Sequence, residues 1–516
     1  MARPWWQTAT FYQIYPRSFQ DSTGDGNGDL RGALSRLDYL AGHPESLGVD
    51  AIWISPFYPS PMKDNGYDVA DYTDVDPRFG TLADFDALLD AAHARGLRVI
   101  VDLVLNHTSD QHPWFREARA DRNAPRHDWY LWADRRPNNW VCAFELASAW
   151  WRNPPTGEYY LGTFTRNQPE VDWRNPELRT AMFDVMRFWL DRGADGFRLD
   201  VVNWYVKDQQ LRSNPLSLRA VPDLFQRHVY DRNRPETIDI CREMRALADD
   251  YGERVLLGEV YGDDPRLAAS YYGDSADALH LATNFNLLFQ PWNARRFADA
   301  IGRWYRALPA GAWPSLNLSN HDQPRHISRY GRGAHEETRA RVAAALILTL
   351  RGTPFLYYGE EIGMRDAHVP RRRIQDPLGR RTWPFRLGRD PQRTPMQWDG
   401  SPGAGFTSGT PWLPIPSDHD QHSVAAQRDD SGSLLAFYRE LVALRRRYAA
   451  LREGAFEFLV RGESDCLAYL RGAGDGTREA GVPGAGAPDA RTTEHGGGPA
   501  VLVVLNFASR ARKLRA

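Results

Sequence analysis

The chain repeats one pattern, in which a short and nearly continuous apolar run is followed by a polar turn and then by an amphipathic helical segment. Eight such runs occur, at residues 9–19, 50–57, 97–107, 196–203, 254–260, 281–289, 315–322 and 353–363. Apolar strands that alternate with helices are buried on both faces, which is typical of a parallel sheet rather than an antiparallel one. Eight units of this kind predict an α/β fold, the (β/α)8 TIM barrel.

The segments between several of these runs are predicted to be helices. Residues 81–96, 176–193 and 335–352 have helical periodicity, and so does 433–448 near the end of the barrel region. Pro176 suits the first turn of its helix, whereas Gly96, Gly193 and Gly352 suit helix C-termini. Each strand of the barrel is therefore expected to be followed by a connection that covers the outside of the sheet.

The spacing between the predicted strands is uneven and indicates additional domains. About ninety residues separate the third strand from the fourth, far more than a normal connection. We therefore predict a barrel at 1–107 and 173–448 with an inserted subdomain at 108–172, after strand 3. Residues 449–516 alternate like strands and predict a small C-terminal β-domain, which includes the Gly-rich segment 471–500.

Composition narrows the class of protein. The net charge of −2 provides no basic surface for nucleic acid, and no apolar run is long enough to cross a bilayer. The start of the chain lacks the apolar core of a signal peptide. Cys142, Cys241 and Cys466 are too far apart to suggest a disulfide framework or a zinc site. We expect a soluble, cytoplasmic monomer or homodimer that binds neither nucleic acid nor membrane.

Carboxylates gather where a TIM barrel places its functional groups, at the C-terminal ends of the strands. Asp200, Glu259 and Asp322 come from strands far apart in the sequence, and Arg198 lies two residues before Asp200. Like charges crowded in a cleft raise one another's pKa, so such a cluster is costly without a function. A single acidic residue at a strand end is more often a helix cap or an ion-pair partner, so the prediction depends on the whole set.

Several motifs resemble those of one enzyme family. The stretches DLVLNH (102–107), QPEVD (168–172), GFRLDVVN (196–203), GEV (258–260) and NLSNHD (317–322) resemble the signatures of the α-amylase superfamily of glycoside hydrolases, family 13. The stretches FYQIYPRSF, DNGYDV (64–69) and GRDPQRTPMQW (388–398) are similar to the α-glucosidase and oligo-1,6-glucosidase branch of that family. The resemblance runs from about residue 5 to residue 450 and supports the barrel prediction.

The resemblance implies a role for each carboxylate. Asp200 is expected to be the nucleophile, Glu259 the general acid/base, and Asp322 the group that holds the sugar in the transition state. A retaining glycosidase uses two carboxyls about 5–5.5 Å apart, one ionised and one protonated. Arg198 is expected to keep Asp200 ionised, and burial is expected to keep a proton on Glu259.

The resemblance also implies a glucose pocket. Its expected sugar contacts are Asp64, Tyr67, His107, His321 and Arg389, with Arg198 beside the nucleophile and Phe144, Phe164 and Gln168 where the inserted subdomain closes over the pocket. Taken singly, such histidines and aromatic residues are as readily explained by core packing. A pocket closed on one side implies an exo-acting α-glucosidase that removes glucose from the non-reducing end of short oligosaccharides or sucrose-like glucosides, through a covalent glucosyl-Asp200 intermediate.

The stretch DSTGDGNGDLRG (21–32) begins like an EF-hand, but its twelfth position is Gly32 instead of a bidentate Glu. Hard oxygen ligands for Ca²⁺ or Mg²⁺ are available on Asp21, Thr23, Asp25, Asn27 and Asp29, and the resembling branch binds such an ion at this loop. The alternative is a Gly/Asp turn that caps the next helix. The ion is expected to be structural, because retaining hydrolysis needs only the two carboxylates.

Three alternatives stay open at this stage. Val201 directly follows the nucleophile, and in the resembling branch Val there accompanies α-1,6 cleavage whereas Thr or Ala accompanies α-1,4 cleavage. An α-glucosyl transferase or isomerase, of the sucrose isomerase or trehalose synthase type, would use the same residues. The stretch RLGRD (386–390) is similar to the RLDRD run of sucrose isomerases, with Gly388 in place of Asp. A non-catalytic barrel that serves as an interaction protein is disfavoured by the complete set of carboxylates.

Overall fold

The computed structural model describes residues 3–217, 225–262, 264–331, 333–385, 387–472, 477–478 and 500–513. Its core is a parallel sheet of eight strands in the order β11-β10-β9-β3-β2-β1-β13-β12. The strands are β1 (Phe11–Ile14), β2 (Ala51–Ile54), β3 (Arg98–Leu103), β9 (Gly196–Leu199), β10 (Val255–Val260), β11 (Leu281–Asn284), β12 (Ser315–Leu316) and β13 (Thr353–Tyr357). The two ends of the sheet meet, because the Ser315 hydroxyl on β12 donates to the Ala282 carbonyl on β11 at 2.6 Å. The TIM barrel prediction is confirmed, and every predicted apolar run contains one strand.

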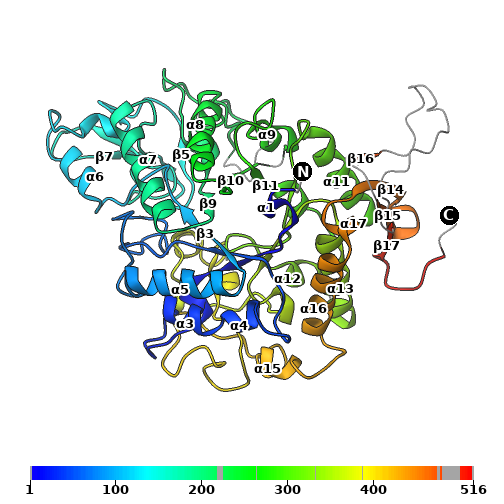
Figure 1. Cartoon of the computed structure of the whole chain (residues 1–516). Helices are drawn as coiled ribbons and strands as arrows, with labels where there is room; N and C mark the ends of the chain where they lie inside the picture. The colour runs from blue at the N-terminus through cyan, green and yellow to red at the C-terminus, as the bar shows by residue number, and fades with distance from the viewer. Residues whose placement is uncertain are drawn as a thin grey trace, which may run out of the picture.

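Helices surround this sheet (Figure 1). The long ones are α5 (Leu82–Ala94), α7 (Pro176–Asp191), α8 (Glu236–Asp250), α11 (Ala294–Ala307), α13 (Glu336–Thr349) and α16 (Leu434–Arg447). Asn175 caps α7, and Gly193 follows its end at φ +98°, in the left-handed region that favours glycine. The short ones are α1 (Trp5–Thr8), α2 (Pro16–Phe19), α3 (Leu30–Ser35), α4 (Leu37–Leu40), α6 (Pro113–Ala118), α9 (Pro265–Ser270), α10 (Phe285–Leu288), α12 (His326–Tyr330), α14 (Pro377–Arg381), α15 (Val424–Gln427) and α17 (Ala449–Arg452).

The strands are shorter than the apolar runs that contain them, and the run at 281–289 continues into a helix. Within residues 281–289, β11 ends at Asn284 and the chain continues as the helix α10. A short apolar run does not by itself distinguish a buried strand from a buried helix. The start of α10 at Phe285 was therefore not predictable from the sequence and is seen only in the structure.

The segment between β3 and α7 folds beside the C-terminal end of β3. Its strands β4 (Trp132–Ala133), β7 (Trp150–Arg152) and β8 (Tyr159–Leu161) form an antiparallel sheet, and β5 (Val141–Cys142) pairs with β6 (Ala147–Ser148). Bridges from His107 to Glu170 and from Tyr130 to Val171 bring the two ends of the segment together. Residues from this segment are thereby placed next to the ends of the barrel strands.

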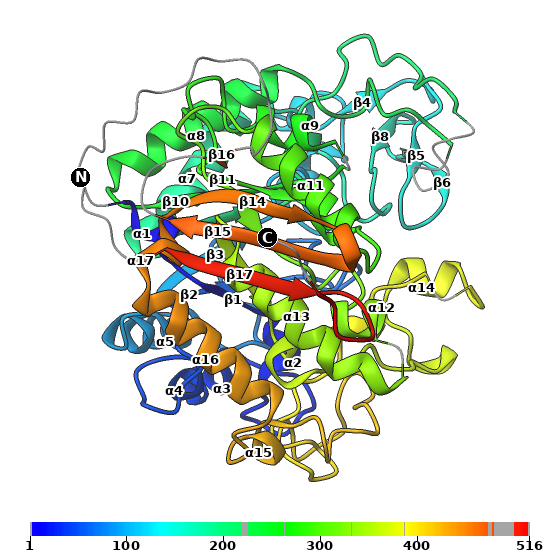
Figure 2. The ribbon, with the colours of Figure 1, turned by 90° about the vertical axis from the view of Figure 1, so that its right-hand side faces the viewer.

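A second sheet lies at the end of the chain, in the order β16-β14-β15-β17, and Figure 2 shows it packed across α11 and α13. Its strands are β14 (Ala455–Arg461), β15 (Cys466–Gly472), β16 (Thr477–Arg478) and β17 (Val501–Asn506). Buried Arg471 donates to the Thr349 carbonyl at 2.5 Å, at the C-terminus of α13, where a cation is favoured. Most of the Gly-rich segment 471–500 lies outside the described residues.

Among the described helices, none combines the length and the apolar character required to span a bilayer. Cys142, Cys241 and Cys466 are buried.

Candidate active site

One arginine joins three carboxylates at the ends of β3, β9 and β10. Arg198 places Nη1 2.5 Å from Asp200 Oδ1 and 2.9 Å from Asp102 Oδ1, and Nη2 2.7 Å from Glu259 Oε2. The exposed fraction of each of these residues is 6% or less. The sequence predicted Arg198, Asp200 and Glu259 here. It missed Asp102, which begins the DLVLNH motif and pairs in register with Arg198 across β3 and β9.

From the sequence, Arg198 was expected to keep Asp200 ionised, but the pKa of Asp200 in this cluster is raised. Burial raises the pKa of Asp200 well above its ordinary value and also raises the pKa of Glu259. Burial likewise raises the pKa of Asp102 to about 6. Arg198 opposes each of these shifts, but its single charge is shared and does not hold the pKa of Asp200 low. Asp200 and Glu259 therefore titrate as a pair that keeps a proton to higher pH than two isolated carboxyls would.

The residue after Asp200 has a strained backbone. Val201 has φ 36° and ψ 46°, in the left-handed region that β-branched residues rarely adopt. Conformations of this kind cost roughly 1–3 kcal/mol and cluster at functional sites. Here the turn aims the Val201 N–H at Glu259 Oε2, at 3.1 Å. No glycine or asparagine marks the position in the sequence, so the strain was not predictable.

Asp322 lies among cations, with its Oδ1 2.6 Å from Arg393 Nη2 and 3.5 Å from Arg389 Nη1. Burial alone would raise the pKa of Asp322, but the charges of Arg393, Arg389 and Arg198 oppose burial, and the pKa lies below its ordinary value. Asp322 is therefore ionised, in contrast to the Asp200–Glu259 pair. The sequence did not single out Arg393, although it lies in the GRDPQRTPMQW stretch.

The two predicted histidines are buried and neutral. Burial lowers the pKa of His107 to about 3 and the pKa of His321 well below its ordinary value. The Gln13 amide lies 2.8 Å from His321 Nδ1, so the proton is on Nε2, which faces Asp322 Oδ2 at 3.2 Å and the Tyr67 hydroxyl at 2.6 Å. The Tyr67 ring stacks on His321, with centroids 5.3 Å apart. The Tyr67 and His321 side chains thus hold each other in place beside Asp322.

The remaining predicted sugar contacts form one connected group. Arg389 Nη2 is 2.5 Å from Asp64 Oδ1, and the Gln168 amide donates to Asp64 Oδ2 at 3.0 Å. Above the Arg389 guanidinium lies the Phe144 ring, 3.9 Å from its carbon to the ring centroid. Phe164 packs between Phe144, His107 and Trp204. The inserted segment therefore reaches the site through Phe144, Phe164 and Gln168.

The loop at residues 21–29 is held by its own hydrogen bonds. Asp21 accepts from the backbone N–H groups of Thr23, Gly24 and Gly26 at 2.8 Å and from the Thr407 hydroxyl at 2.5 Å. Asp29 accepts from Ser22 and caps α3 through the Gly32 N–H, while Asp25 accepts from Asn27. Across the part of the chain that the structure describes, no three acidic, histidine or cysteine side chains group as a metal cage. A cation at this loop would have to replace some of these hydrogen bonds, so the ion stays a prediction.

Removal of divalent cations tests this loop. If the loop binds Ca²⁺ or Mg²⁺, EDTA should lower the melting temperature and leave the initial rate unchanged, because the loop contacts Thr407 and α3 rather than the carboxylate cluster. The comparison is a melting curve with EDTA and with added Ca²⁺, for the wild type and for Asp21→Asn. An unchanged melting temperature would count against an ion, and immediate loss of rate would contradict a structural role.

The barrel and its buried carboxylates define the class of protein as a glycoside hydrolase of the TIM barrel type. A profile of the α-amylase catalytic domain matches residues 13–454. The chain belongs to the α-amylase family, glycoside hydrolase family 13, and is an enzyme of that family.

Individual relatives cover nearly the whole chain. A probable alpha-glucosidase of Rhizobium meliloti (strain 1021) is 45% identical over 492 residues, covering 92% of this chain and 88% of the relative. An oligo-1,6-glucosidase of Parageobacillus thermoglucosidasius is 37% identical over 510 residues, covering 92% and 89%. The solved structure of the alpha-glucosyl transfer enzyme XgtA is 44% identical, with a TM-score of 0.87 over 91% of this chain and 89% of that one. A mutant of the trehalulose synthase MutB, solved in complex with Tris, is 36% identical, with a TM-score of 0.85 over 92% and 90%.

Proposed function

We propose that the protein is a retaining, exo-acting α-glucosidase that cleaves glucose from the non-reducing end of short oligosaccharides or sucrose-like glucosides. The observation that carries the proposal is the bridge formed by Arg198 between Asp200 and Glu259, two carboxyls whose pKa values are raised by burial, with the charge of ionised Asp322 acting on Glu259. Relatives named alpha-glucosidase and oligo-1,6-glucosidase support it.

In the first step Asp200 attacks the anomeric carbon while Glu259 gives its proton to the glycosidic oxygen. The glucosyl-Asp200 ester forms, and the remainder of the substrate leaves with that proton. In the second step Glu259 takes a proton from water, whose oxygen attacks the anomeric carbon and releases Asp200. The Val201 N–H helps to hold Glu259 in place in both steps.

The other groups bind and orient the glucose. Asp64 and Arg389 offer a carboxylate and a guanidinium suited to paired sugar hydroxyls. Ionised Asp322 stabilises the positive charge that develops on the sugar in an oxocarbenium-like transition state. Phe144, Phe164 and Gln168 close one side of the site, which favours removal of a single terminal glucose.

The test follows isomaltose, maltose and sucrose separately by proton NMR from the first minutes of reaction. Release of α-glucose before mutarotation is the expected result, and the fastest substrate identifies the preferred linkage. Initial release of β-glucose would contradict retention, and no reaction with any of the three would contradict the proposed substrates.

A second candidate is an α-glucosyl transferase or isomerase that uses the same residues. It is favoured by the likeness to XgtA and MutB and by an apolar cluster of Phe144, Phe164, Val201 and Trp204 beside the site, which would restrict water. In the same NMR experiment, new glycosidic signals without net glucose would identify this activity.

A further inference from the structure

Arg389 also pairs with the carboxylate of Asp376, a residue that was not identified from the sequence. Asp376 Oδ1 is 2.7 Å from Arg389 Nε and 2.6 Å from Nη2, and the same Nη2 atom contacts Asp64 Oδ1 at 2.5 Å. The Asp376 side chain is fully buried. Asp64 and Asp376 make the short contacts to this guanidinium and Asp322 a longer one at 3.5 Å, so the position of Arg389 depends on Asp376 as well as on Asp64.

Asp376 is itself fixed to the short helix α14. Its Oδ2 accepts from the Gly379 N–H at 2.8 Å and caps the helix, while its own N–H donates to Asp390 at 3.0 Å. A shift of α14 would therefore move Asp376, and with it the contact between Asp376 and Arg389.

The position of α14 is set by contact between two glycine backbones. A Cβ atom placed on Gly388 would lie 2.5 Å from the Gly379 Cα, 2.9 Å from the Gly379 N and 3.0 Å from Asp376 Oδ2. Neither glycine has a left-handed φ, so glycine is needed here for space and not for backbone conformation. Any side chain at 388 must push α14 and Asp376 away from Arg389.

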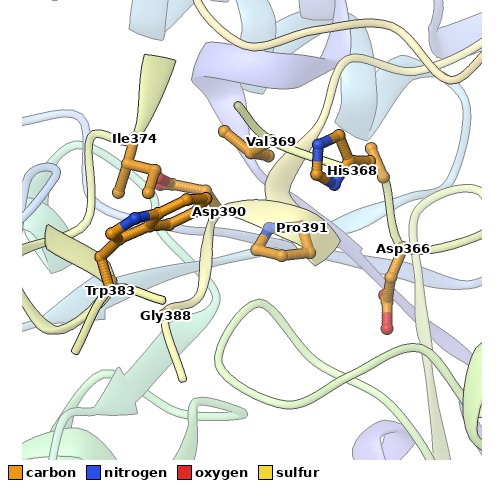
Figure 3. A pocket seen from close by; sticks show the side chains of 10 residues that line it. Asp366, His368, Val369, Ile374, Trp383, Gly388, Asp390 and Pro391 are labelled. Atoms are coloured by element: carbon orange, nitrogen blue, oxygen red, sulfur yellow. The ribbon is translucent and has the colours of Figure 1, made fainter. Parts of the chain in front are cut away.

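Space is available for such a shift without disturbing the barrel. A cavity of about 270 Å³ adjoins the contact and is lined by Ile374, Gly379, Trp383, Gly388, Asp390 and Pro391, among others (Figure 3). In Figure 2, α14 lies at the right-hand edge of the molecule, outside the ring of barrel helices. Arg380 and Arg381 on α14 are exposed.

We propose that Asp376 is a positioning residue for Arg389 and that the Gly379–Gly388 contact sets the depth at which Arg389 reaches the sugar. The proposal rests on the proposed function only in taking Arg389 as a sugar contact. The contact between α14 and Gly388 then determines how tightly the terminal glucose is held, although neither Asp376 nor Gly388 needs to touch the sugar.

The test compares Gly388→Ala and Asp376→Asn with the control Gly400→Ala, where the nearest atom to the new Cβ is 3.7 Å away. Loss of a charge-assisted contact should raise KM and the inhibition constant of glucose about tenfold in both variants. The value of kcat should change much less, because the contact is present in the ground state and in the transition state. The double variant should lose less than the product of the two single effects, because both act through Arg389. The control should match the wild type.

Crystal structures of the variants provide a readout that does not depend on activity. The Arg389–Asp64 contact, 2.5 Å in the wild type, is expected to lengthen or break in both variants. Unchanged KM, glucose inhibition and Arg389 position in folded variants would overturn the proposal. If the wild type neither binds glucose nor cleaves glucosides, the proposed function fails, while the structures still decide whether Asp376 and Gly388 position Arg389.

Discussion

The Asp200→Asn variant is expected to lose activity by a factor on the order of 10⁴ to 10⁶, the range seen when enzymes lose their catalytic side chains. Asparagine has nearly the same shape and keeps an oxygen for Arg198 Nη1, which lies 2.5 Å from Asp200 Oδ1. Its amide is too weak a nucleophile to form the glucosyl ester. The measurement is kcat/KM on the fastest of the three glucosides, together with a melting curve.

The control for this variant is Asp184→Asn, on the exposed surface of α7, where the Asp184 side chain is 65% exposed. Both variants should melt close to the wild type, so that a loss of rate in Asp200→Asn alone is chemical and not structural. If folded Asp200→Asn retained more than about a tenth of the activity, Asp200 would not be the nucleophile.

The Arg198→Met variant is expected to lose about 3–5 kcal/mol of unfolding free energy, in addition to its activity. It leaves the carboxyls of Asp102, Asp200 and Glu259 buried without their shared cation. Arg31→Met is the control, because the Arg31 side chain is 71% exposed and an exposed ion pair such as the one with Asp84 contributes little to stability. Denaturant unfolding of both variants measures the difference.

The pH dependence identifies the cause of this loss. Without Arg198 the pKa values of the buried carboxyls rise further, so the folded variant binds protons that the unfolded chain has released. A raised carboxyl pKa contributes stability at low pH that is lost as the pH rises through the folded pKa. The stability deficit of Arg198→Met should therefore be smaller at pH 4 than at pH 7. A deficit that does not depend on pH would point to lost packing instead.

Much of the fold was predictable because its signals are local. The apolar runs marked all eight strands of the barrel sheet, and helical periodicity marked α5, α7, α13 and α16 within a few residues of their ends. The end of β11 at Asn284 was not predictable, because the apolar run continues into α10 without a breaker.

The site was predictable only where a residue ends a strand or lies in a motif. Asp200 and Glu259 met both conditions, and the structure brings them together through Arg198. Asp102 was missed because its partner is 96 residues away, although the strand register pairs the two positions. Asp376 was missed because it lies in a long loop without periodicity, and its contact with Arg389 depends on how α14 packs.

The most direct test of the account is to trap the glycosyl-enzyme. The protein is incubated with 5-fluoro-α-D-glucosyl fluoride, whose glycosyl ester hydrolyses slowly, and is then digested and sequenced by mass spectrometry. The account predicts one fluoroglucosyl group on Asp200, absent from Asp200→Asn, with Glu259 unlabelled. A label on any other residue, or none under conditions where the enzyme turns over its substrate, would contradict a mechanism through Asp200.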